Sequence, residues 1–306
     1  MLNTELPSLT SDIIFKSFML DDDVKEYKAE LIHLITNIPK EDILNNSIYI
    51  NNELPINTRN NKRYRCDIIL SISNNIINIE MNNIYYKGII EKNNSYTFKI
   101  LGDRYAKGED YINLKKVYQI NIDNYEIYPE SKLLYKFKIV EESGKYLETE
   151  NYESYHLNLE YLRKKCYNNC KLTRLEHLCK LFFITNKEEA EELAKEDDIM
   201  EKAVNKLYEL SEDEKLMGLY DAEKVDQMTQ NTMKLSARLE GIEEGKKVGL
   251  EEGKKVGLEE GKKVGLEEGQ QKEKIEITKK LLEKKIDIET ISSITELSIK
   301  EIEELN

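Results

Sequence analysis

The sequence predicts an α/β domain, a mixed sheet flanked by helices, followed by an α-helical C-terminal region. Three observations lead to this prediction. Residues 47–121 form short β-rich runs with one helical interruption, residues beyond 164 follow an almost wholly helical pattern, and residues 241–271 carry an octapeptide repeat. We therefore expect a core of residues 1–164, a helical region of residues 165–240, a repeat linker of residues 241–271 and a small helical unit of residues 272–306.

The composition describes an acidic chain. Its 306 residues carry a net charge of -13, from 46 basic and 59 acidic side chains. This charge argues mildly against a dedicated nucleic-acid binder, but it allows an enzyme that meets DNA through a local basic patch. Apolar runs are too short for a membrane span, and the N-terminus lacks the pattern of a secretion signal. We expect a soluble cytoplasmic protein.

Two helices are expected near the N-terminus. Residues 10–12 offer side-chain caps for a helix that begins at Ile13. After the acidic residues 21–23, a second helix runs to about Asn37 and contains Glu30. It should stop before Pro39, because the residue before a proline disfavours helical angles.

The next part is expected to alternate strands with one helix. Predicted strands cover residues 48–54, 66–73, 76–82, 115–122, 134–140 and 155–161, and a helix covers residues 88–107. Asn74 and Asn75 separate two of the strands, and asparagine tolerates the left-handed angles of a hairpin turn. These elements fit an α/β or α+β sheet domain.

The hairpin of residues 66–82 carries the most informative pattern. A symmetric turn at Asn74 and Asn75 would place Ile69 opposite Glu80 and Asp67 opposite Asn82. Glu80 would then be a diagonal neighbour of Asp67 on the same face, about 7 Å away or less. One face of the hairpin is wholly apolar: Ile68, Leu70, Ile72, Ile77, Ile79 and Met81. The other face gathers Asp67, Ser71, Asn78, Glu80 and Asn82.

Two carboxylates on one sheet face repel each other unless a cation lies between them. Hard oxygen ligands suit Mg²⁺ or Mn²⁺, and such an ion can activate water and stabilise charge on a phosphodiester. The alternative is a solvent-facing polar side with incidental acids, and the pattern gives both interpretations similar weight. The basic residues Lys62, Arg63 and Arg65 precede Asp67 and either contact phosphate or form the solvated start of a strand.

The cysteines give a second candidate metal site. Cys166, Cys170, His177 and Cys179 lie close together in sequence, but their spacing is not that of a paired zinc knuckle. Because the segment has a helical pattern, buried thiols are favoured over zinc. Cys66 lies apart from this group. The glycines cluster in the repeat, so the chain has no nucleotide-binding loop and no nucleotide cofactor is expected.

The octapeptide repeat begins with Gly at positions 241, 249, 257 and 265. Each helical Gly costs about 1 kcal/mol relative to Ala, so a marginal helix or flexible spacer is favoured over a stable coiled coil. Residues 272–306 regain an apolar pattern that fits one helix and two short ones. They lack a basic recognition helix, which favours a protein contact, with a homodimer as a candidate, over DNA reading.

The ordered motifs resemble a bacterial family of recombination-promoting nucleases and transposases with a PD-(D/E)xK nuclease fold. The likeness covers nearly the whole chain. Residues 12–18 look like the family's opening motif, residues 65–67 and 79–82 like its two core strands, and residues 88–111 like the following helix and its G-x-x-Y ending. The resemblance implies a restriction-endonuclease-like sheet.

The resemblance also implies roles for individual residues. Asp67 and Glu80 would bind Mg²⁺ or Mn²⁺, with Glu30 as an additional acid. Asn82 would take the catalytic position of the fold's lysine, where the family usually has Gln; the shorter amide departs from that pattern and carries no charge. Lys87, Lys92 and Lys99 are candidates for a basic residue in the following helix. Lys92 and Tyr96 join Lys62, Arg63 and Arg65 as candidate DNA contacts.

The function predicted in this way is a metal-dependent DNA endonuclease linked to transposition or recombination, which hydrolyses phosphodiesters with a metal-activated water. The alternative is a weak or inactive nuclease-fold protein that serves as a binding or assembly module. Loss of the lysine position, the acidic charge and the repeat-rich tail favour the alternative. A transcriptional regulator ranks last, because the terminal helices lack a basic surface.

Overall fold

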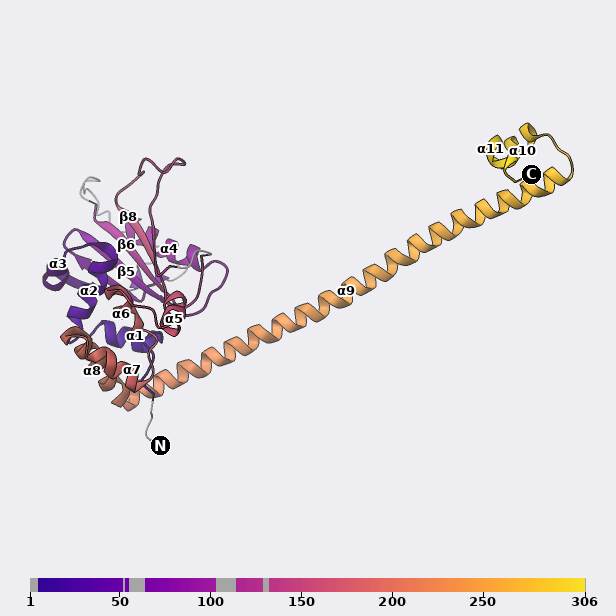
Figure 1. Cartoon of the computed structure of the whole chain (residues 1–306). Helices are drawn as coiled ribbons and strands as arrows, with labels where there is room; N and C mark the ends of the chain where they lie inside the picture. Colours follow the sequence, from indigo (N-terminus) through magenta and orange to yellow (C-terminus); the bar gives the residue numbers. More distant parts are fainter. Residues whose placement is uncertain (1–4, 52, 55–63, 103–113, 129–131, 306) are drawn as a thin grey trace. The chain divides into compact units, whose positions relative to one another are not determined.

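The computed structural model describes residues 5–51, 53–54, 64–102, 114–128 and 132–305. Two compact units divide the chain, Met1–Asp226 and Gln227–Asn306. The first contains the sheet and the helices that pack on it (Figure 1).

The first unit begins with the expected helices. Helix α1 spans Asp12–Met19, and the Ser11 side chain caps it by accepting from the Ile14 amide. Helix α2 spans Lys25–Thr36 and ends at Asn37, whose φ of 64° is the left-handed angle that closes many helices. Helix α3 covers Lys40–Asn46. The cap predicted for the first helix and the end predicted for the second are therefore confirmed.

A six-stranded mixed sheet forms the centre of this unit. The strands lie in the order β1-β4-β5-β6-β8-β7, with β5, β6 and β8 parallel and the remaining pairs antiparallel. Their bounds are Ser47–Ile50 (β1), Ile68–Ile72 (β4), Asn75–Asn82 (β5), Lys116–Asp123 (β6), Leu134–Phe137 (β7) and Tyr152–Asn158 (β8). A separate short pair joins β2 (Glu53–Leu54) to β3 (Tyr64–Arg65). The predicted mixed sheet is confirmed.

Three of the predicted strands differ from the observed ones, and the one expected over residues 134–140 ends at Phe137. The strand expected over residues 48–54 is divided between β1 and β2, which belong to different sheets. The strand expected over residues 155–161 ends at Asn158, whose side chain accepts from the Tyr161 amide and starts helix α5 (Leu159–Tyr167). An asparagine that satisfies a free helical amide ends the strand there.

The two faces of the sheet are covered differently. The wholly apolar face of the hairpin joins a large core with α1 and α2, as the alternation predicted. Helix α4 (Ile89–Gly102) covers the opposite face, on the other side of the sheet from α2 and α3 (Figure 1). There, Tyr96 and Ile100 pack against Cys66, Ile69 and Ile76.

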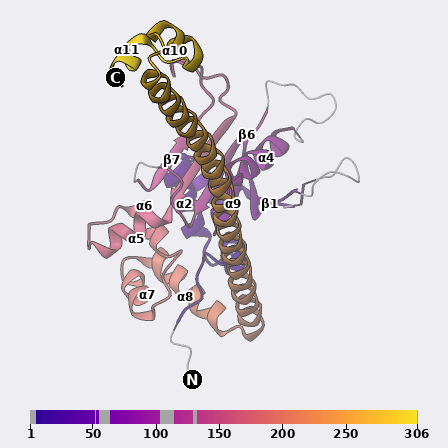
Figure 2. The same cartoon turned by 90° about the vertical axis from the view of Figure 1, so that its right-hand side faces the viewer.

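The helices that follow the sheet share its core. Helices α6 (Arg174–Lys180), α7 (Lys187–Ala194) and α8 (Asp198–Glu212) follow α5, and α7 and α8 pack side by side (Figure 2). Leu178, Phe182 and Leu207 are fully buried in the same cluster as the sheet residues. The helices on both sides of residue 164 therefore share one hydrophobic core, in which α6 and α8 pack against α2.

Helix α9 spans Glu214–Glu283 and includes the octapeptide repeat, whose valine and leucine side chains are exposed. The repeat is thus helical. Its end joins α10 (Ile288–Thr295) and α11 (Ile299–Glu303) around a small core of Ile291, Leu297 and Ile302. The predicted arrangement of one helix and two short ones is confirmed. Among the described residues, every helix is too short or too polar to cross a membrane.

Candidate active site

The hairpin between β4 and β5 brings Asp67 and Glu80 together. Its turn lies at Ser73 and Asn74, where Ser73 takes a left-handed φ of 50°, and β5 already begins at Asn75. Ile69 therefore pairs with Asn78, and the predicted pairing of Ile69 with Glu80 is wrong. The shift keeps every side chain on its predicted face. Continuing the register by one residue places Asp67 beside Glu80 as a direct neighbour.

Backbone hydrogen bonds fix both carboxylates at this point. The Asp67 amide donates to Glu80 Oε1 at 3.2 Å, and the Met81 amide donates to Asp67 Oδ2 at 2.9 Å. The Glu80 carboxylate is thus held by the Asp67 amide. The Asp67 carboxylate is held by the amide of Met81, the residue after Glu80.

Two lysines from separate helices reach the carboxylates. Lys16 of α1 lies 3.0 Å from Asp67 Oδ1 and 2.7 Å from Asp12 Oδ1. Lys92 of α4 lies 3.7 Å from Glu80 Oε2. The motif of residues 12–18 thus meets the hairpin at the site. The motif alone gives Asp12 and Lys16 no role at the site, because only the fold shows where α1 points.

Burial makes this pair of acids electrostatically costly. Glu80 is 1 % exposed, and burial together with the nearby Asp67 charge raises its pKa to about 8. Burial also raises the pKa of Asp67, although the Lys16 ammonium opposes the rise. The Asp67 and Asp12 charges in turn outweigh burial and raise the pKa of Lys16. Added positive charge at this place would relieve the repulsion.

The raised pKa of Glu80 predicts a pH-dependent stability in the presence of a chelator. The folded chain keeps a proton on Glu80 that the unfolded chain releases above its ordinary pKa of 4.5. The free energy of unfolding should therefore fall as pH rises from about 5 to about 8, by at least about 1.4 kcal/mol for a tenfold difference in proton affinity. Urea unfolding across this range measures it. Glu80→Gln should remove this part of the decline. Glu126→Gln, which changes a carboxylate in an exposed pair with Lys164, should keep it.

A row of buried polar side chains extends from Glu80 across three parallel strands. Asn78 donates to Glu80 Oε1 at 3.2 Å and to Gln119 Oε1 at 2.8 Å. Gln119 donates to Asn121 at 2.9 Å, and Thr97 of α4 donates to Gln119 at 2.8 Å. Sequence reasoning missed Gln119, Asn121, Asp123 and His156. Their signal was a polar residue at every second position of a central strand that should otherwise be apolar.

Asn82 lies two residues beyond Glu80 on the same face of β5. It is 3 % exposed, and its Nδ2 donates to Asp123 Oδ1 at 3.0 Å. Glu30, the candidate third acid, pairs instead with Lys40 at 3.0 Å and Arg174 at 2.5 Å. These cations outweigh burial and lower the pKa of Glu30. In this arrangement both of its oxygens are engaged by cations.

The candidate DNA contacts are of three kinds: two lie beside Glu80, one is exposed in β3, and two lie outside the described residues. Lys92 reaches Glu80 as described and lies 5.2 Å from the centre of the Tyr96 ring. Tyr96 is 8 % exposed, and burial followed by the Glu80 charge raises its pKa. Arg65 is exposed in β3. Lys62 and Arg63 lie outside the described residues, as do residues 108–111 of the helix-ending motif.

The cysteines lie in different environments. Cys179 is buried in α6, and burial raises its pKa. Cys166 is half-buried in α5, whereas Cys170 is exposed. His177 pairs through Nδ1 with Glu196. The expectation of buried helical thiols therefore fits Cys179 but not Cys170.

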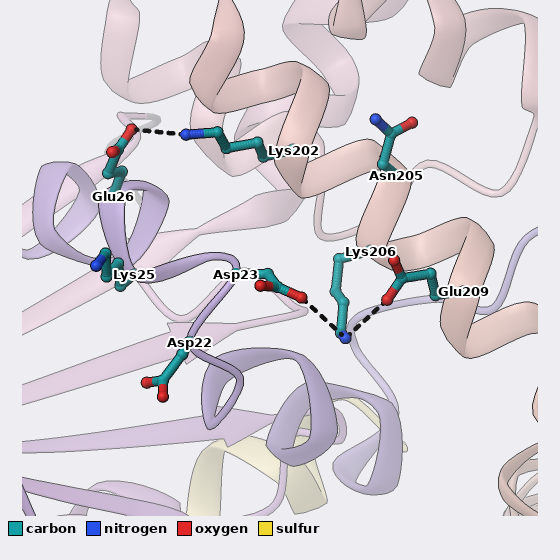
Figure 3. Close-up of a pocket in the computed structure, with 8 residues that line it drawn as sticks. All are labelled: Asp22, Asp23, Lys25, Glu26, Lys202, Asn205, Lys206 and Glu209. Atoms are coloured by element: carbon teal, nitrogen blue, oxygen red, sulfur yellow. Dashed lines mark hydrogen bonds and ion pairs between the residues drawn. The ribbon is translucent and has the colours of Figure 1, made fainter.

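A separate open pocket of about 430 Å³ lies between the start of α2 and α8 (Figure 3). Charged residues of both signs line it, and Lys206 pairs with Asp21 at 2.6 Å and Glu209 at 2.8 Å. These ion pairs satisfy one another, and no predicted site residue lines the pocket. Its contacts join α8 to the N-terminal helices.

The Asp67–Glu80 pair fits a divalent cation by the chemistry of its donors. Both ligands are carboxylates, the hard oxygen donors that Mg²⁺ and Mn²⁺ prefer. Within the described parts of the chain, no group of three or more His, Cys, Asp or Glu side chains is placed to hold a metal. A cation bound by this pair would need further oxygen ligands to complete its shell.

Comparison with known protein families matches residues 9–236 to PD-(D/E)XK nuclease family transposases. This span includes α1, the whole sheet and the helices that share its core. The chain belongs to this family. The fold predicted from the resemblance is confirmed by the match and by the mixed sheet flanked by helices. Comparisons with curated proteins and with solved structures gave no match.

Proposed function

We propose that this member of the PD-(D/E)XK nuclease family transposases is a metal-dependent DNA endonuclease that acts in transposition or recombination. The observation that carries the proposal is the direct pairing of Asp67 and Glu80, each hydrogen-bonded to the strand segment of the other. Two neighbouring carboxylates, one buried and one partly buried, cost folding free energy, and a bound cation would offset that cost. The pair is therefore better explained by ion binding than by packing.

The proposed site divides the chemistry among several side chains. Asp67 and Glu80 would hold Mg²⁺ or Mn²⁺, which supplies a Lewis acid that lowers the pKa of water and neutralises phosphate charge. Lys16 fixes the orientation of the Asp67 carboxylate through its contact at 3.0 Å. Lys92 supplies the positive charge that Asn82 lacks, because its ammonium already lies beside Glu80.

Lys92→Gln is expected to lower the cleavage rate about 100-fold with a smaller change in DNA affinity. The loss of one preorganised charge beside the reacting phosphate has an effect of this order. Initial nicking rates under saturating DNA measure it. Lys164→Gln removes a lysine from the exposed pair with Glu126 and should leave the rate unchanged. Equal rates for Lys92→Gln and wild type would mean that a residue other than Lys92 supplies the positive charge.

The proposal is tested by cleavage of supercoiled plasmid by the purified full-length chain. Nicking that requires Mg²⁺ or Mn²⁺ and stops with a chelator supports the endonuclease. No nicking, together with no heat of Mn²⁺ binding by calorimetry, supports the alternative of a binding or assembly module. Clear Mn²⁺ binding without nicking would mean that the plasmid is the wrong substrate or that a partner is required.

The proposal includes a homodimer through the C-terminal unit. Ile277, Ile294 and Ile299 of this unit are exposed apolar side chains around its small core. Two copies would supply two active sites for the two strands of DNA. Light scattering of the full chain, beside a variant with all three isoleucines changed to Ser, measures this oligomeric state.

A further inference from the structure

Two buried amide oxygens flank Glu80 on β5. Asn78 and Asn82 are 0 % and 3 % exposed, and the Oδ1 atom of each has no hydrogen-bond partner among the described residues. Alternate residues of a strand share a face, so both side chains lie on the same side of the sheet as Glu80. Buried polar atoms are almost always paired, and an exception calls for a physical explanation.

The orientation of the Asn82 amide follows from its partner. Asn82 Nδ2 lies 3.0 Å from Asp123 Oδ1, and a carboxylate can only accept. The nitrogen must therefore face Asp123. The Asn82 oxygen is consequently turned away from Asp123, and it is the atom left without a donor.

Asp123 is fixed in turn by His156. Asp123 Oδ2 lies 2.7 Å from His156 Nδ1, and His156 Nε2 lies 3.3 Å from Asn121 Nδ2. Asn121 Oδ1 accepts from Gln119 at 2.9 Å, so the Asn121 nitrogen is the atom that faces the ring. The hydrogen bonds are satisfied together when the His156 proton is on Nδ1 and Nε2 accepts.

We propose that Asp123 and His156 are positioning residues that hold Asn82 with its amide oxygen, rather than its nitrogen, available to the Asp67–Glu80 site. This inference rests on the proposed function and refines it. Asn82 then acts as a neutral oxygen acceptor for the cation and its hydration shell and does not replace a lysine. The positive charge comes from Lys92, which lies 3.7 Å from Glu80.

The orientation can be tested without metal or substrate. Nitrogen-15 spectra of the histidine rings in the full chain report which ring nitrogen is protonated, and His156→Gln identifies the signals of His156. We expect the His156 proton on Nδ1. A neutral ring with its proton on Nε2 would overturn the proposal, because Asp123 would then lack its donor. His33, whose Nδ1 lies 2.8 Å from the Ile38 carbonyl, and His177 serve as internal references.

The consequence for the site is tested by Mn²⁺ affinity, measured by calorimetry. His156 and Asn82 face different oxygens of Asp123, and an asparagine at position 123 would replace one of these oxygens by an NH₂ group, which cannot accept. Asp123→Asn should therefore weaken Mn²⁺ binding tenfold or more, as loss of a supporting hydrogen bond does at metal sites. Glu126→Gln should bind as wild type does. Unchanged affinity in Asp123→Asn would overturn the proposal.

A second variant covers the case in which Asp123→Asn does not fold. Asn82→Leu keeps the shape of the side chain and removes its oxygen, so it should also weaken Mn²⁺ binding tenfold or more. Wild-type affinity in Asn82→Leu would contradict the role of the oxygen. Failure of the wild type itself to bind Mn²⁺ would refute the proposed function, while the ring spectra would still decide the orientation of Asn82.

Discussion

Asp67→Ala and Glu80→Gln are each expected to lower metal-dependent cleavage by at least about 10³-fold, because each removes one of the two carboxylates that would hold the cation. Both acids lie at the same place on the hairpin, so neither can substitute for the other. Initial rates of plasmid nicking in Mg²⁺, with Mn²⁺ affinity measured on the same samples, check the prediction.

The matched control for this pair is Glu126→Gln. Glu126 is a carboxylate in an exposed pair with Lys164 at 2.9 Å, and its loss should change neither rate nor affinity. Both active-site variants should fold, because each relieves the repulsion between the neighbouring Asp67 and Glu80 carboxylates. Cleavage that persists in Asp67→Ala at a rate near that of wild type would place the reaction elsewhere on the chain.

The face of the hairpin on which each side chain lies could be predicted from the sequence, because polar and apolar residues alternate along the strands. The alternation of residues 67–82 placed the acids on one face and the isoleucines on the other, and burial in the structure agrees. A slip of one residue would have exposed the apolar set, so the pattern excluded that error. It did not exclude a slip of two, which moves Glu80 from a diagonal position to one beside Asp67.

Contacts between elements distant in sequence could not be predicted in this way. The register depended on whether Ser73 or Asn75 entered the turn, and asparagine's tolerance of left-handed angles favoured the wrong one. The meetings of Lys16 with Asp67 and of Asp123 with Asn82 join elements that only the fold brings together. Likewise, the helical pattern beyond residue 164 did not show that those helices complete the core of the sheet.

Phe182→Ala is expected to lower the free energy of unfolding by about 3–5 kcal/mol and to unfold sheet and helices together. Phe182 follows α6, is fully buried, and lies 6.3 Å from Phe15 of α1 between ring centres. Its removal leaves a cavity where two distant parts of the chain meet. Urea unfolding checks this, with tyrosine fluorescence reporting mainly on the sheet domain and circular dichroism reporting on the helices.

Phe98→Ala is the matched control, because Phe98 is 53 % exposed on α4 and its loss should cost less than about 1 kcal/mol. A shared core requires the tyrosine signal and the helical signal to shift to the same new midpoint in Phe182→Ala. If the helical signal alone moved, residues after 164 would form a core of their own. A common shift would make this helical region part of the scaffold that holds α1, and with it Lys16, against Asp67.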